Sequence, residues 1–166
     1  MFWNNASTPM SRTTAKCGAL GLILLMLLGC APGKRPFLMV QMCLSDQRGV
    51  TTFVEEMRSI ATSQRMEFLD NSADTARGLD AVGYTGRERS DGSPVINFGI
   101  QQKDGKGAFA GNQGLPGYQV AIGFSEGSKP DEAREFAALV VKRLKQRWPV
   151  QVVPDGKGAM PLEGCQ

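Results

Sequence analysis

The side chains with the greatest chemical reactivity in this sequence are four cysteines, because the chain contains no histidine. Without histidine the commonest general base is missing, and neither a Ser-His-Asp nor a Cys-His arrangement can form. Glu55 and Glu56 are neighbours on a predicted helix, so their carboxylates point in different directions and cannot share a proton. The sequence therefore predicts that the protein is not an enzyme and uses no cofactor.

The other acidic residues give no stronger sign of a catalytic or metal site. Glu67 and Asp70 flank a short predicted strand, and Asp131, Glu132 and Glu135 lie where they favour the dipole of a predicted helix. Two cysteines, Cys43 and Cys165, with no histidine anywhere in the chain make a poor zinc site. We therefore expect no metal.

The N-terminal segment has the layout of an export signal. Arg12 and Lys16 precede an apolar run at residues 19–28. A membrane-spanning helix needs about 20 apolar residues, and this run has about half of that. We interpret residues 1–29 as a signal peptide, with Met10 as a second candidate start, and residues 30–36 as a tether.

The end of this signal, Leu27-Leu28-Gly29-Cys30, resembles the lipobox of bacterial lipoproteins. The resemblance implies that Cys30 receives a diacylglyceryl group, that the chain is cut between Gly29 and Cys30, and that the new amino terminus is acylated. Leu28 is bulkier than the residue usual at its place. The alternative is an ordinary secretory signal with an incidental cysteine.

The same resemblance implies a location in the cell envelope. Two or more acyl chains hold a protein stably at a membrane. In Gram-negative lipoproteins an Asp after the lipidated cysteine favours the inner membrane, and Ala31 stands there instead. The expectation is an outer-membrane lipoprotein that faces the periplasm. The resemblance covers about twenty residues, and the domain that follows resembles no family that we recognise.

Two cysteines are left for the mature domain. Cys17 leaves with the signal peptide and Cys30 is the expected lipid site, so Cys43 and Cys165 remain. An even number in an oxidising compartment favours a disulfide. Such a bridge would stabilise the fold by about 4–5 kcal/mol in the chain-entropy model, and it would tie down the tail at residues 154–166.

Hydrophobic periodicity predicts one domain over residues 37–153, with the order β-α-β-β-β-α-β. One more helical turn is expected near residues 73–79. The expected fold is α+β, a ferredoxin-like split β-α-β antiparallel sheet with one extra strand and two helices packed on one face. Its strands are expected at residues 37–44, 66–69, 96–100, 118–124 and 150–153, and its helices at 46–63 and 128–148.

A glycine-rich segment at residues 103–117, with five glycines, is predicted to be a long hairpin loop. It lacks the GKS or GKT ending and the following helix of a phosphate-binding loop. The segment is either a mobile hairpin tip or a recognition loop. In the second case Phe109 would be an aromatic anchor for a protein partner, with Lys106, Asn112 and Gln113 beside it.

The charge of the predicted mature chain excludes a nucleic-acid role. Removing residues 1–29 leaves 17 of the 19 basic side chains against all 16 acidic ones, a net charge of +1. Together these features predict a lipid-anchored, non-catalytic binding or accessory module that contacts an envelope protein. The alternative is a periplasmic immunity or inhibitor lipoprotein that blocks a cell-wall hydrolase toxin or a lysozyme.

Overall fold

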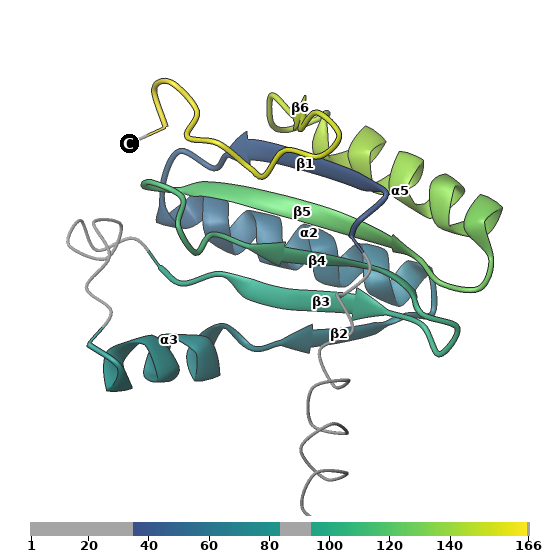
Figure 1. Ribbon diagram of the computed structural model, residues 1–166, viewed down its shortest axis with the longest axis horizontal. Coiled ribbons are helices and arrows are strands. Elements are labelled where there is room, and N and C mark those ends of the chain that lie inside the picture. The colour runs from purple at the N-terminus through teal and green to yellow at the C-terminus, as the bar shows by residue number, and fades with distance from the viewer. Residues whose placement is uncertain (1–34, 84–93, 166) are drawn as a thin grey trace, which may run out of the picture. The chain divides into compact units, whose positions relative to one another are not determined.

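The computed structural model describes residues 35–83 and 94–165. These residues form an antiparallel sheet of six strands in the order β2-β3-β4-β5-β1-β6, accompanied by three helices (Figure 1). The expected α+β class is confirmed. The strands are β1 (Leu38–Cys43), β2 (Glu67–Asp70), β3 (Asn97–Gln101), β4 (Lys106–Gly111), β5 (Gln119–Glu126) and β6 (Gln151–Val152), and the helices are α2 (Gln47–Ser63), α3 (Ser72–Ala81) and α5 (Pro130–Leu144).

The connections match the ferredoxin-like prediction only in part. From β5 through α5 to β6 the chain crosses β1, which is antiparallel to both strands, and this is a split β-α-β unit. From β1 through α2 to β2 the chain crosses three strands, β5, β4 and β3. A split unit encloses one strand, so the ferredoxin-like topology is not confirmed.

Helix α2 forms where the periodicity predicts it. The Asp46 carboxylate caps its start by accepting a hydrogen bond from the Gly49 amide at 2.7 Å. The buried residues recur every three or four positions and therefore make one stripe: Val50, Phe53, Met57, Ile60 and Ala61.

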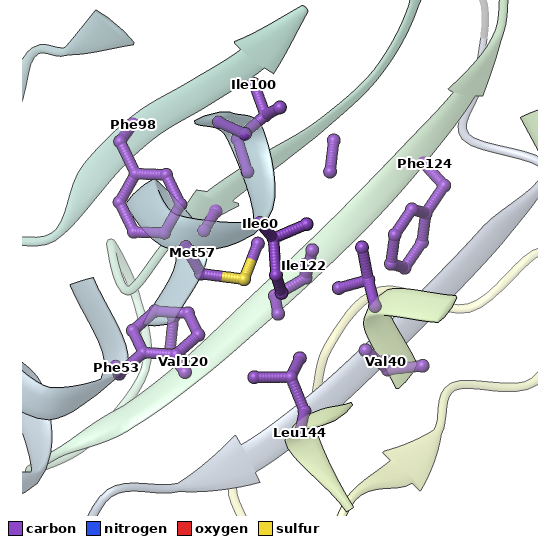
Figure 2. Close-up of a cluster of buried hydrophobic side chains, with 14 of the residues drawn as sticks. Val40, Phe53, Met57, Ile60, Phe98, Ile100, Val120, Ile122, Phe124 and Leu144 are labelled. Atoms are coloured by element: carbon purple, nitrogen blue, oxygen red, sulfur yellow. The ribbon is translucent and has the colours of Figure 1, made fainter. Parts of the chain in front are cut away.

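The core lies between α2, α5 and one face of the sheet. Alternate strand residues point to this face, because side chains alternate along a strand. The rings of Phe53 on α2 and Phe98 on β3 are 5.4 Å apart. Figure 2 shows how the two layers meet through Val40, Phe53, Met57, Ile60, Phe98, Ile100, Val120, Ile122, Phe124 and Leu144.

The prediction of a long loop at residues 103–117 is wrong for the first half of that segment. Strand β4 occupies residues 106–111 and pairs with both β3 and β5, so the sheet gains a sixth strand. A short turn precedes it, in which Gly105 has a φ of 87° and the Asp104 carboxylate accepts from the Lys106 amide at 2.9 Å. An Asp-Gly pair is a strong hairpin signal, and here it turns the chain directly from β3 into β4.

Helix α3 is longer than the single expected turn. It has ten residues and none of them is buried. Both α2 and α5 cover the same face of the sheet, as expected, whereas α3 lies at the end next to β2 (Figure 1).

The predicted disulfide is confirmed. Cys43 on β1 is bonded to Cys165 in the tail, with 5.5 Å between their Cα atoms and 122 positions between them in the chain. The bridge ties the C-terminal tail to the domain. Within the described ranges no helix is long and apolar enough to cross a membrane.

Candidate functional site

The side of the sheet away from α2 and α5 differs in composition from the core side, and we call it the open face. Cross-strand pairing aligns one row of residues on it from β2 to β1. At the centre of this row one aromatic ring lies between two glycines. The row comprises Leu69, Gly99, Phe109, Gly123 and Met39.

Phe109 is the prominent apolar side chain of the open face. It lies opposite Gly99 and Gly123 in the pairing register, and 50% of it is exposed. A Cβ atom at Gly123 would come within 2.3 Å of the Phe109 ring. Glycine at position 123 therefore allows the ring to lie against the backbone of β5.

Beside this ring the open face contains a hollow of about 300 Å³, which we call the open-face hollow. None of the described residues that line it carries a charge. Its floor is made of glycine and alanine, and its walls carry apolar and amide side chains: Met39, Asn97, Phe109, Gln113, Leu115 and Ala159. Such a surface can contact an apolar group with little cost in desolvation.

One wall of the hollow comes from the C-terminal tail. The tail runs in front of β1 in Figure 1, and its Ala159 lines the hollow. The fully buried side chain of Gln119 donates to the Met160 carbonyl at 2.7 Å and accepts from the Leu162 amide at 2.8 Å. The Gln41 side chain accepts from the Met160 amide at 3.0 Å. Together with the disulfide, these bonds hold the wall in place.

The four residues predicted for a contact loop do not form one group. Lys106 points to the helix side, where its ammonium pairs with Glu132 at 3.1 Å and its side chain is only 12% exposed. Asn112 is 6% exposed and accepts from the Ile96 amide at 2.8 Å. Both side chains are therefore part of the fold, and the prediction of a shared contact loop is wrong for them.

The structure does bring the other two predicted residues together. Phe109 and Gln113 line the same hollow, and the Gln113 side chain donates to the Ile96 carbonyl at 2.8 Å. Their contact with a partner stays a prediction. Gly29 and Cys30, the predicted cleavage and lipid site, lie outside the described residues.

A small cluster of charged side chains lies on the helix side of the sheet, near the start of α5. Hydrogen bonds from Lys129 and then Lys106 lower the pKa of the Glu132 carboxyl, and the bond to Glu132 raises the pKa of Lys129. Lys129 and Glu132 are 2.8 Å apart on the surface of the helix. These groups stabilise a helix start and do not face the open-face hollow.

The described part of the chain contains no group of three cysteine or carboxylate side chains that could hold a metal ion.

Comparisons place the chain in no known family. No family model matches it, and neither a curated protein nor a solved structure does.

The residues of the hollow that the sequence did not point to include Met39, Gly123 and Ala159 of the tail. A signal for the first two was present. Alternation along the predicted strands puts Met39 and Gly123 on the side opposite the core residues Val40 and Phe124. For the tail no signal existed, because it reaches the hollow through contacts between residues far apart in the chain.

Proposed function

We propose that this protein is a lipid-anchored lipoprotein of the bacterial cell envelope that acts as a non-catalytic binding or accessory module. The observation that carries the proposal is the sequence Leu27-Leu28-Gly29-Cys30 at the end of a short apolar run. The Cys43–Cys165 disulfide supports it, because such bridges persist in oxidising compartments outside the cytoplasm. Ala31 after the lipid site favours an outer-membrane protein that faces the periplasm.

The anchor would keep the domain next to the membrane. Cys30 is five residues before Arg35, where the described domain begins. A chain of that length spans at most about 18 Å. The domain would therefore meet membrane-bound or periplasmic proteins at a raised local concentration.

The open-face hollow is the surface that we propose for contact. Half-exposed Phe109 beside a glycine floor offers the kind of aromatic anchor that carries much of the energy at protein interfaces. No described group there could act as a nucleophile next to a base, which favours binding over catalysis.

The anchor is tested by producing the full chain in a Gram-negative host with a fatty-acid probe in the medium. We expect Cys30→Ser to abolish labelling and to leave the uncleaved precursor. Cys17→Ser is the matched control, because it changes a cysteine within the signal peptide and should be labelled like the wild type. Labelling of Cys30→Ser would refute the anchor.

The contact surface is tested by crosslinking in the envelope followed by purification. Phe109→Lys should lose proteins that the wild type captures, because a cation in the hollow must be desolvated. Val82→Lys is the control, since Val82 is 78% exposed and lies after α3. Equal capture by both variants would remove the hollow as the contact surface. A cell-wall hydrolase as the main captured protein would favour the inhibitor role over the accessory role.

A further inference from the structure

We infer that Gln41 and Gln119 on the open face form a binding site for an extended peptide segment, and that the chain's own C-terminal tail fills this site until a dithiol reduces the Cys43–Cys165 disulfide. The inference goes beyond the proposed function, because it depends neither on the lipid anchor nor on a contact at Phe109. It is carried by the bonds that the two glutamines make, by their burial and by the position of the disulfide.

The two glutamine side chains bind the tail through its backbone. Gln119 donates to the carbonyl of Met160 at 2.7 Å and accepts from the amide of Leu162 at 2.8 Å. Gln41 accepts from the amide of Met160 at 3.0 Å. Residues 158–162 form neither helix nor turn. In an extended chain the backbone groups of alternate residues point to the same side, so the site binds the tail as a sheet edge binds an added strand.

The tail's side chains contribute less to this contact than its backbone. Met160, whose amide and carbonyl are both bound, is 64% exposed. Pro161 after it is also exposed, whereas Leu162 is half-buried. Main-chain bonds of this kind give affinity for an extended segment, and side-chain pockets give specificity. A segment of another sequence that offers the same three backbone groups therefore meets the requirements of the site.

The burial of the two glutamines shows that the site needs an occupant. Gln119 is 0% exposed and Gln41 is 8% exposed, and their side-chain amides lie 3.5 Å apart. A buried amide without a partner is costly, because it has lost its hydrogen bonds to water. The disulfide already holds the tail covalently, so the glutamines add a second, reversible hold. When the tail leaves, an extended peptide can supply the same bonds.

The disulfide lies where it can control this exchange. Cys43 is opposite Gln119 in the pairing of β1 with β5, and it is half-buried, whereas Cys165 is 1% exposed. A thiolate of a dithiol attacks Sγ of Cys43, which forms a mixed disulfide and releases the Cys165 thiolate to take up a proton. The second thiol then displaces Cys43, so the dithiol becomes a disulfide and the protein gains two electrons and two protons. Hydrogen bonds alone then compete with an incoming segment.

The experiment uses the full-length protein, labelled with ¹⁵N, and a synthetic peptide with the sequence of residues 157–164. The opened variant carries Cys43→Ser, Cys165→Ser and Leu162→Pro, so it cannot form the bridge and its own tail lacks one backbone donor. The peptide should shift the NMR signals of the two buried glutamine amides. In oxidised wild type the same shift should need at least about tenfold more peptide, because the attached tail competes at a high effective concentration.

Matched controls separate backbone binding from other contacts. A peptide N-methylated at the positions of Met160 and Leu162 lacks two donors and should cause no shift. A peptide with Met160→Lys should bind within about twofold of the original, because the site does not enclose that side chain. In the opened variant, Gln119→Met should abolish binding, since methionine cannot donate these bonds. Gln151→Met, at an exposed position of β6, should leave binding unchanged.

Thermal unfolding shows whether each variant folds. If the opened variant does not fold, reduced wild type takes its place, and hydrogen exchange at the Met160 and Leu162 amides becomes the measurement. The peptide should then speed this exchange, because it displaces the tail. The inference is overturned if a folded opened variant shows no shift, or if reduced wild type in its place shows no faster exchange. Equal binding by the N-methylated peptide, or by oxidised wild type, would overturn it as well.

Discussion

The two sides of the sheet differ sharply although the same strands build them. On β3 and β5 the core side carries Phe98, Ile122 and Phe124, all buried under α2 and α5. One position along, the open side carries Gly99 and Gly123. The large residues stabilise the fold by removing apolar surface from water, whereas glycine within a strand contributes no packing and weakens the strand.

Within a single strand, one residue can therefore stabilise the fold while its neighbour is exposed and free to contact a partner. Phe109 and Ala110 are neighbours on β4, yet the alanine is buried against the helices and the phenylalanine is half exposed. A change on the core side should therefore affect folding, and a change on the open side should affect association.

The largest expected effect comes from a matched pair of phenylalanines on adjacent strands. Phe98→Ala should lower the free energy of unfolding by about 3–5 kcal/mol, because it removes a fully buried ring and leaves a cavity. Phe109→Ala should cost only about 1 kcal/mol, since half of that ring is exposed. Urea unfolding of the two variants measures both values. Equal losses would contradict the division between the two sides.

Loss of the disulfide should have the next largest effect, and it should reach the open side as well. Cys43→Ser with Cys165→Ser should lower the free energy of unfolding by about 2–5 kcal/mol, because the unfolded chain gains freedom. The tail that carries Ala159 should also exchange its amide protons faster. Wild-type protein treated with a dithiol reductant is the control and should behave alike. A variant as stable as the oxidised wild type would contradict this role of the bridge.

The smallest expected effect is an acid dependence confined to the ion cluster at the start of α5. The Glu132 carboxyl has an ordinary pKa of 4.5, which Lys129 and Lys106 lower in the fold. Because the folded pKa lies below the unfolded one, its contribution to stability is present above pH 4.5 and is lost as the pH falls through the lowered value. Glu132→Gln should remove this part of the pH dependence, and Glu135→Gln on the same helix is the control. Identical acid unfolding curves for Glu132→Gln and wild type would contradict it.

Much of the fold could be predicted from local patterns. Helix α2 shows a clear apolar stripe, and α5 has Asp131 and Glu132 in its first turn and Lys142 and Arg143 in its last. Even the disulfide followed from counting cysteines, since only Cys43 and Cys165 were left. The two helices depend on residues close in sequence, and the disulfide depends on the number of cysteines. None of these predictions requires knowledge of the strand order.

What could not be predicted depends on long-range pairing. Strand β4 has the sequence Lys-Gly-Ala-Phe-Ala-Gly, whose glycines and alanines have low strand propensity, so it resembles a loop until β3 and β5 are placed on either side. Asn112 was a contact candidate, but its side chain holds the backbone at Ile96. The open-face hollow depends on the same placement, because its walls come from residues 39, 109 and 159.

The most direct test of the central claim is a mass measurement on the first peptide of the protein purified from the envelope of a Gram-negative host. The proposed lipid anchor requires that the mature chain begins at Cys30 and that this peptide carries the added mass of a diacylglyceryl group and an amide-linked acyl chain. A peptide that begins at another residue, or an unmodified Cys30, would refute the anchor.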